Sequence, residues 1–358
     1  MKRNLLQYLV CPDCQGGLDC RAIIAQGEDI ETGTLGCSHC RKEYPIMRGI
    51  PRFVTSANPL TGENVQTADA FGWQWQAFKE LHDLATYEAQ FLDWLQPIPP
   101  EFFQGKVVLD AGCGMGRFSL VSSAFGAKLV LAVDASDAVE AAADNARQVS
   151  NVHVIQGDIH RLPLRHGQQA QVDFVFSLGV LHHLDNPQAG FKALIRHLRP
   201  GGTIYAWVYG RENNGWLVNF VNPIRTVLTS RLPRYALYGL SWLITAGLHP
   251  LLKWVYQPVN KVKPVAWLRK ILPYNDYFAW LGQFQFRHNH HVVFDHLVAP
   301  VAFYLQREEF EAWFTEAGLE IISLTWRNRN SWRGHGRFAQ TQANNDAVFT
   351  AEKISIAC

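Results

Sequence analysis

The chain has 358 residues, of which 48% are hydrophobic and 18% are charged. This composition excludes a disordered chain and allows one main globular domain with smaller additions. The formal net charge of +2 excludes a protein that is basic over its whole surface, as many nucleic-acid-binding proteins are. The apolar run before Cys11 is too short for a signal peptide, so we expect a cytoplasmic protein.

Residues 1–56 contain two C-x-x-C units, Cys11–Cys14 and Cys37–Cys40, with 22 residues between them. This spacing is close to that of a zinc ribbon, and thiolates suit a tetrahedral ion. We therefore predict a structural Zn²⁺ held by Cys11, Cys14, Cys37 and Cys40. Cys20 and His39 are interpreted as non-ligands. The alternatives are four unpaired thiols or a redox dithiol.

Residues 57–105 are predicted to form a turn-rich linker and an aromatic helical lid. The pattern indicates helices over 71–78 and 86–95. Most aromatic side chains in this region are expected to pack these helices against the main domain. The alternative is that some of them form a lid over a ligand, where Trp73 or Trp75 would receive a cationic group through a cation–π contact.

Residues 106–210 alternate between buried strands and helices. A strand over 107–109 ends at Asp110, and a turn with Gly112, Gly114 and Gly116 leads into a helix at Arg117. Glycines in such a turn let the backbone approach a ligand that lies over a helix N-terminus. Further strands are predicted at 128–134, 152–156, 173–178 and 203–209. This order predicts a doubly wound α/β fold with a parallel sheet.

The second strand of this region ends at Asp134, 24 residues after Asp110. A carboxylate at this position can accept both hydroxyls of a ribose. A strand, a glycine turn and an acid also occur in dinucleotide-binding folds. The turn lacks the third-glycine spacing of those folds, and Gly157-Asp158 follows the third strand, so the NAD alternative is less favoured.

The segments VLDAGCGMGRFS, AVDAS, GDIHRLPL, FVFSLGVLHHL and LRPGG occur in order over residues 105–210. This series resembles the class I methyltransferases that use S-adenosylmethionine (SAM), of the methyltransferase type 11-like group. The N-terminal region, with its tail YPI-x-x-GIP, resembles the zinc-ribbon domains of small methyltransferase activator proteins. The first resemblance implies a Rossmann-like seven-stranded sheet and a SAM site. That site would comprise Asp110, Gly112, Cys113, Gly114, Gly116, Asp134, Ala135, Asp158, Ile159, Ser177 and Leu178.

The family roles carry over by position. Asp110 and the backbone of Gly112 and Gly114 would hold the methionine end of the cofactor. Asp134 would hold the ribose. Residues 158–159 would flank the adenine, and residues 177–180 would pass beneath the sulfonium.

Residues 211–300 form an insertion that is expected to be mostly helical and to set the substrate. Apolar helices are predicted at 216–220, 224–232, 236–248 and 251–255, with His249-Pro250 ending the third. Three interpretations of these apolar helices stay open: a helical cap buried against the domain, an apolar substrate pocket, or a patch for peripheral membrane contact. The titratable cluster between His288 and His296 is expected to bind the acceptor or to form structural hydrogen bonds, with a metal site as the alternative.

Residues 301–358 are predicted to complete the sheet. A helix over 308–317 precedes a sixth strand over 319–326, and an antiparallel seventh strand is expected at 346–351. The polar segment 327–336, which contains two glycines, is interpreted as a surface loop or as a loop that contacts the substrate.

We expect a SAM-dependent methyltransferase whose acceptor is a small-molecule, lipid-like or natural-product compound, with O-, N- and C-methylation left open. His182, His183 and Tyr209 are the candidate catalytic residues, with His182 favoured to face the site and Glu212 in second rank. One alternative is an rRNA or tRNA base methyltransferase whose zinc ribbon docks the RNA. A local basic patch supports it: Arg327, Arg329, Arg333 and Arg337. The low net charge makes nucleic acid an unfavoured partner. The other alternative is a non-catalytic SAM-binding partner.

Overall fold

The computed structural model describes residues 1–56, 58–79 and 84–339. Its centre is a seven-stranded sheet in the order β10-β11-β9-β8-β5-β6-β7. Strands β5 to β9 run parallel, and β11 is antiparallel to both β9 and β10. The strands are β5 (Val107–Ala111), β6 (Leu129–Asp134), β7 (Val152–Gln156), β8 (Val172–Leu178), β9 (Leu198–Tyr209), β10 (Leu319–Arg327) and β11 (Ser331–Phe338). The predicted doubly wound seven-stranded fold is confirmed.

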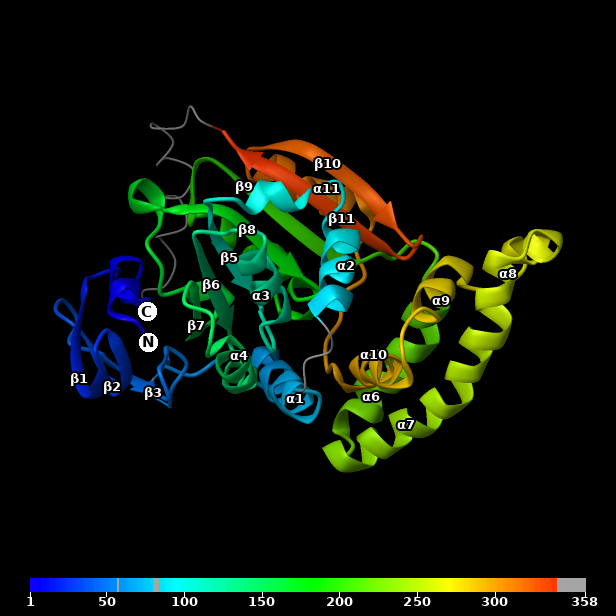
Figure 1. Cartoon of the computed structure of the whole chain (residues 1–358), viewed down its shortest axis with the longest axis horizontal. Helices are drawn as coiled ribbons and strands as arrows, with labels where there is room; N and C mark the ends of the chain where they lie inside the picture. The colour runs from blue at the N-terminus through cyan, green and yellow to red at the C-terminus, as the bar shows by residue number, and fades with distance from the viewer. Residues whose placement is uncertain (57, 80–83, 340–358) are drawn as a thin grey trace, which may run out of the picture.

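Helices cover both faces of this sheet (Figure 1). Along β5, Val107 and Leu109 belong to one buried apolar cluster and Val108 belongs to the other, as alternation in a strand requires. The first cluster includes apolar side chains of α5 (Pro187–Ile195) and α11 (Arg307–Glu316). The second includes side chains of α2 (Leu84–Leu95), α3 (Arg117–Ala124) and α4 (Ala138–Ala146). Helix α1 (Glu63–Ala77) begins eight residues before the predicted aromatic helix and packs against α4.

The N-terminal region forms a separate four-stranded sheet beside β7 (Figure 1). It consists of the short helix η1 (Arg3–Gln7) and strands β1 (Leu18–Gln26), β2 (Asp29–Cys37), β3 (Glu43–Met47) and β4 (Ile50–Pro51). The Phe53 amide donates to the Gln156 carbonyl over 2.8 Å at the open edge of β7. Because apolar residues of both sheets share one cluster, the N-terminal region is packed on the sheet.

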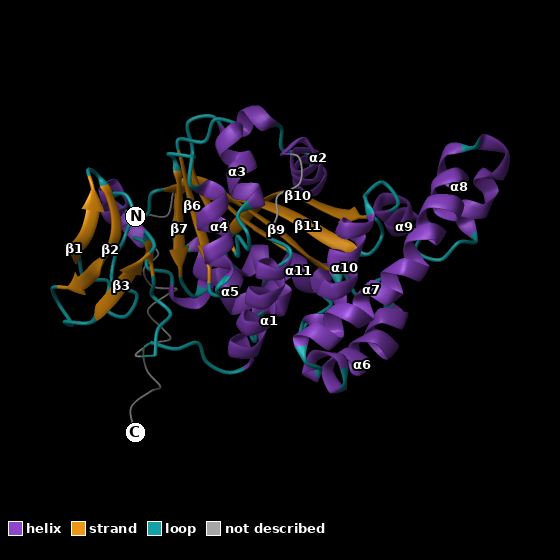
Figure 2. Ribbon diagram, turned by 60° about the horizontal axis from the view of Figure 1, so that its bottom comes forward, coloured by secondary structure: helices purple, strands orange, loops and turns teal. Residues whose placement is uncertain are grey.

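The insertion after β9 extends from the end of the molecule that lies opposite β1–β4 (Figure 2). Its elements are η6 (Leu217–Val221), α6 (Asn222–Val227), η7 (Thr229–Arg231), α7 (Arg234–Leu251), η8 (Leu252–Tyr256), α8 (Gln257–Lys261), η9 (Lys263–Lys270), α9 (Asn275–Leu281) and α10 (Phe286–Val298). The prediction that Pro250 ends a helix is wrong, because Pro250 lies inside α7. The wider π-helical turn η8 follows directly, which is one way for a helix to accommodate the hydrogen bond that proline cannot donate. Within the described ranges, no helix has both the length and the apolar character needed to cross a membrane.

The prediction of a loop over 327–336 is also wrong for its second half. Residues from Ser331 onward form β11, which lies between β9 and β10 and is the antiparallel strand of the sheet. The two glycines make room for a neighbouring ring: a Cβ on Gly334 would lie 2.5 Å from Cζ of Phe314, and one on Gly336 would lie 2.6 Å from its Cδ1. The strand expected at 346–351 lies outside the described residues.

Four histidines at different places in the fold are each buried. Burial lowers the pKa of His153, His183, His197 and His335 to about 4. The unfolded chain, with ordinary histidine pKa values near 6.5, takes up these protons first as the pH falls. The free energy of unfolding is therefore expected to decrease between pH 6.5 and 4, by up to about 1.4 kcal/mol per pH unit for each histidine. Urea denaturation at pH 7 and pH 5 measures this change.

His335→Phe removes one titrating group from an aromatic environment formed by Phe102, Phe174 and Tyr205. This variant should show a shallower dependence of stability on pH than the parent chain. Equal urea midpoints for the parent at pH 7 and pH 5 would contradict the expectation.

Candidate functional site

The glycine turn between β5 and α3 is shaped by close contacts. Gly112 has φ +85° and Gly114 has φ +53°, a region that favours glycine. A Cβ on Gly112 would lie 2.3 Å from a methyl group of Val180, and one on Gly114 would lie 2.8 Å from the Trp75 ring. Val180, which follows β8, and Trp75, from the lid helix α1, therefore enclose the turn.

Asp134, at the end of β6, is held in a fixed orientation. Its Oδ2 accepts the Gly114 amide over 2.9 Å, and its Oδ1 accepts the amide and hydroxyl of Ser136 over 2.9 and 2.6 Å. Burial raises the pKa of Asp134, and these hydrogen bonds oppose the shift. Each carboxylate oxygen has two lone pairs, so the two hydrogen bonds from Ser136 fill Oδ1, and Oδ2 keeps one lone pair for the cavity that the side chain lines.

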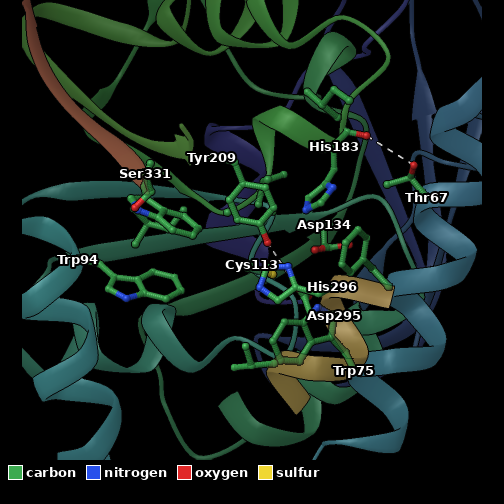
Figure 3. A pocket seen from close by; sticks show the side chains of 18 of the residues that line it. Thr67, Trp75, Trp94, Cys113, Asp134, His183, Tyr209, Asp295, His296 and Ser331 are labelled. Carbon is green, nitrogen blue, oxygen red and sulfur yellow. Dashed lines mark hydrogen bonds between the residues drawn. The ribbon is translucent and has the colours of Figure 1, made fainter. Parts of the chain in front are cut away.

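A cavity of about 1640 Å³, including its open mouth, lies at the carboxyl ends of β5, β6 and β8. One wall comes from the parallel sheet. The other walls come from α1, α2, α9 and α10 (Figure 3). The Phe, Trp and Tyr side chains that line the cavity are Phe71, Trp75, Trp94, Phe118, Trp207, Tyr209, Tyr277, Trp280 and Tyr304.

The structure brings most of the predicted cofactor residues to this cavity. The residues that line it are Gly112, Cys113, Asp134, Ala135, Asp158, Ile159 and Leu178. Four other predicted residues support the wall from behind: Asp110, Gly114, Gly116 and Ser177. Asp110 accepts a hydrogen bond from Ser119 over 2.6 Å, and burial raises the pKa of Asp110 to about 7. Ser177 donates to the Ala111 carbonyl over 3.0 Å.

Of the two predicted catalytic histidines, His183 lies at the cavity and His182 lies in the core. His183 lines the cavity, and its Nδ1 lies 2.6 Å from the Val301 carbonyl oxygen. Only a protonated Nδ1 can donate there, which leaves Nε2 of the neutral ring as an acceptor. His182 is fully buried and its ring packs on Tyr209, with 3.9 Å between ring centroids. The expectation that His182 faces the site is therefore wrong. The short turn after β8 directs His183, and not His182, into the cavity.

Tyr209 and Asp295 form a second polar group at the same end of the cavity. Tyr209 Oη donates to Asp295 Oδ2 over 3.3 Å (Figure 3). Gln74 donates to Asp295 Oδ1 over 3.0 Å. Burial, together with the negative charge of Asp295, raises the pKa of Tyr209 well above its ordinary value. Burial alone would raise the pKa of Asp295, but His183, His291 and His296 lower it overall. Tyr209 thus stays protonated while Asp295 stays negative.

The histidine cluster of α10 faces the cavity with His288, His291 and His296. The contacts of His291 with Gln74 and of His296 with Tyr277 fit the expectation of structural hydrogen bonds, and an acceptor-binding role stays a prediction. Over the parts of the chain that the structure describes, the only group of three or more metal-ligating side chains is formed by the four cysteines. Nothing therefore supports the alternative of a metal in the histidine cluster.

Sequence reasoning missed Tyr304 and Arg327 as cavity residues, and it missed Gln74 as a buried hydrogen-bond partner of Asp295. Arg327, at the end of β10, is paired with Asp93 of α2 and lies over the Trp280 ring at 4.6 Å. No local sequence pattern marks these residues, because contacts with residues distant in sequence position them. Glu212, a second-rank catalytic candidate, instead accepts hydrogen bonds from the Trp332 indole and the Arg307 amide over 2.9 and 2.7 Å.

The basic patch expected to favour RNA is neutralised within the chain. Arg327 and Arg333 are buried. Arg329 pairs with Asp276 over 2.8 Å, and Arg337 pairs with Glu320 over 3.4 Å. The patch is therefore not a free basic surface, and it offers the RNA alternative no support.

The four cysteines of the C-x-x-C units converge at one end of the N-terminal sheet. All four Sγ atoms lie within 4.8 Å of one another, with Cys11–Cys40 at 3.6 Å and Cys14–Cys37 at 3.4 Å. A tetrahedral Zn²⁺ with bonds of about 2.3 Å needs sulfur–sulfur distances of about 3.8 Å, so the cluster fits the ion. Tyr44 Oη lies 3.2 Å from Cys11 Sγ and donates to Asp13 over 2.7 Å, which orients the ligand shell. Cys20 and His39 lie outside the group, as expected.

The order of the sheet, the glycine turn and the acid after β6 define the class of SAM-binding methyltransferase domains. The comparison with family models agrees: residues 109–206 match the methyltransferase domain, and residues 2–49 match the Trm112p-like proteins. The chain thus joins a Trm112p-like domain, with a cysteine cluster that fits zinc, to a methyltransferase domain.

Similar curated proteins include the ubiquinone biosynthesis O-methyltransferase of Pseudomonas fluorescens SBW25. It is 30% identical over 140 residues, which cover 39% of this chain and 58% of that protein. The corresponding enzyme of Pseudomonas entomophila L48 is 29% identical over 144 residues, which cover 40% and 60%. The chain therefore spans about three fifths of the length of these relatives.

Solved structures that are similar to this chain at low identity include two methyltransferase structures. The complex of the Haloferax volcanii Trm112 methyltransferase activator with a methyltransferase has a TM-score of 0.44 and 15% identity, covering 76% of this chain and 98% of that chain. Magnesium protoporphyrin IX methyltransferase of Synechocystis PCC 6803, with bound SAM, has a TM-score of 0.43 and 14% identity, covering 79% and 100%.

Proposed function

We propose that the chain transfers a methyl group from SAM to a hydroxyl of a small, largely apolar acceptor bound in the large cavity. One observation carries this proposal: a single cavity joins Asp134 and Gly112 to the polar group of His183, Tyr209 and Asp295. The similarity to O-methyltransferases supports the choice of a hydroxyl. The aromatic walls favour an acceptor with an apolar or aromatic body.

The residues at the sheet end of the cavity suit the cofactor. Asp134 would accept a ribose hydroxyl with the Oδ2 lone pair that Gly114 leaves free. Asp158 and Ile159 would flank the adenine, and Gly112 would let the cofactor approach the backbone. When bound, SAM supplies an electrophilic methyl group on a sulfonium, which becomes a neutral thioether after transfer.

His183 would act as the general base at the other end. Burial lowers its pKa to about 4, so the ring is neutral near pH 7 and Nε2 is free to accept a proton. The acceptor hydroxyl would give its proton to Nε2 while its oxygen forms the new bond to the methyl carbon. The negative charge of Asp295 would stabilise the resulting imidazolium. Val301 keeps the ring in the required tautomer through Nδ1.

Methyl-labelled SAM, incubated with the full-length protein and separate lipid, aqueous, protein and RNA fractions of a lysate, tests this function. The proposal predicts label in small molecules that extract into organic solvent. Label confined to RNA would instead establish the base-methyltransferase alternative. No transfer to any fraction would contradict an enzyme and favour a non-catalytic SAM-binding partner.

A further inference from the structure

The insertion after β9 has an unusual charge pattern. Residues 213–275 contain no aspartate or glutamate. The same stretch contains eight lysines and arginines: Arg225, Arg231, Arg234, Lys253, Lys261, Lys263, Arg269 and Lys270. Since the whole chain has a formal charge of only +2, its positive charge is concentrated in this one extension.

The buried stripe of the long helix α7 is narrow and partly polar. It consists of Leu237, Ser241 and Thr245 and faces α10. Ser241 Oγ lies 2.9 Å from His290 Nε2, and Thr245 donates to the Ser241 carbonyl over 2.7 Å. The opposite face carries the large apolar side chains. In a helix that only covers a core, the apolar stripe would face inward.

The exposed apolar side chains continue through the rest of the insertion. Leu243 of α7 is 65% exposed, Trp254 of η8 is 77% exposed and Trp267 of η9 is 62% exposed. Other exposed large apolar residues between 216 and 271 are Trp216, Phe220, Ile224, Val227, Leu228, Tyr235, Tyr238, Leu240, Trp242, Ile244, Leu251, Val255, Val262 and Ile271. An apolar surface of this extent indicates an interaction site.

We propose that this insertion docks the protein on the surface of a membrane that contains anionic lipids. Leu243 and Trp254 would enter the boundary between headgroups and acyl chains, as the apolar face of an interfacial helix does. Lys261, Lys263 and Lys270 would bind the anionic headgroups. A tryptophan beside a basic residue, as in Lys253-Trp254, suits the headgroup region. The tryptophan ring enters the apolar layer, and the lysine ammonium stays among the polar headgroups.

Charge also distinguishes a lipid surface from a second copy of this chain. A two-fold dimer places the same patch on both partners. Such a dimer would bring together two basic surfaces, because residues 213–275 of each copy contain no acidic side chain. An anionic membrane instead complements both the charge and the apolar side chains.

Flotation of the full-length protein with vesicles tests the proposal. The vesicles are phosphatidylcholine alone or phosphatidylcholine mixed with phosphatidylglycerol, without cofactor or acceptor. We expect binding to the mixed vesicles, at least tenfold weaker binding to phosphatidylcholine alone, and weakening of the binding by salt. Because no methyl transfer is measured, failure here is distinct from failure of the proposed enzymatic function.

Two variants locate the surface. The double variant Leu243→Glu/Trp254→Glu and the triple variant Lys261→Glu/Lys263→Glu/Lys270→Glu should each reduce partitioning at least tenfold. Ile23→Glu, which changes a 74% exposed isoleucine in β1, is the matched control and should bind as the parent does. Equal circular dichroism and thermal midpoints for all chains confirm folding.

Two outcomes would overturn the proposal. One is the absence of parent binding to either vesicle. The other is a stable dimer in analytical ultracentrifugation that Leu243→Glu/Trp254→Glu dissociates while vesicle binding is unchanged; it would assign the surface to a second copy.

Discussion

Removal of zinc is expected to unfold the N-terminal sheet while leaving the central sheet folded. The four thiolates lie within 4.8 Å of one another, and without an ion they lose the bonds that hold the two C-x-x-C turns together. Structural zinc supplies roughly 10–16 kcal/mol in small zinc-finger peptides, which is more than a sheet of this size can replace. Hydrogen exchange before and after treatment with a strong chelator should show lost protection in β1–β4.

The matched variants for this prediction are Cys14→Ser and Cys20→Ser. Cys14 belongs to the cluster, whereas Cys20 lies in β1 outside it. Cys14→Ser should lower the zinc content and the thermal midpoint, and Cys20→Ser should keep about one zinc ion per chain, as a four-thiolate site predicts. A parent protein that contains much less than one ion per chain would contradict the assignment.

Replacement of His183 is the second large effect expected. His183→Asn should lower kcat by about 10²–10⁴, the usual contribution of a general base. The affinity for SAM should change little, because His183 is assigned to the acceptor end of the cavity. Steady-state rates with the acceptor found in the label-transfer experiment, together with SAM binding by calorimetry, separate the two effects.

His182→Phe is the neighbouring control. His182 is buried against Tyr209 and does not line the cavity, so an aromatic replacement should affect kcat much less than His183→Asn does. A larger loss of kcat in His182→Phe than in His183→Asn would show that the histidine roles are reversed.

The central sheet could be predicted from the sequence because its signals are local. The buried run at 107–111 has an acid, Asp110, as its penultimate residue, and the run at 129–134 ends at an acid. The glycines that follow β5 take positive φ values, as such a turn requires. The seventh strand could not be predicted in this way. In β11, Gly334 and Gly336 suggest a loop locally, but the reason for them is the Phe314 ring of α11.

The cofactor half of the site was accessible to sequence reasoning for the same reason. Asp134 and Gly112 belong to motifs with fixed spacing. The acceptor half is assembled from α1, β9 and α10, so the contact of Gln74 with Asp295 has no local signature. The choice between His182 and His183 depends on the direction of one short turn after β8, which only the three-dimensional structure defines.

The central claim is that the cavity beside Asp134 binds SAM. Isothermal titration calorimetry of SAM with the parent chain, Asp134→Ala and the surface control Asp144→Ala tests it most directly. We predict one SAM per parent chain, an affinity loss of about 1–3 kcal/mol for Asp134→Ala because a ribose hydroxyl loses a charged partner, and no loss for Asp144→Ala. Unchanged affinity in Asp134→Ala, or no SAM binding by the parent chain, would contradict the account.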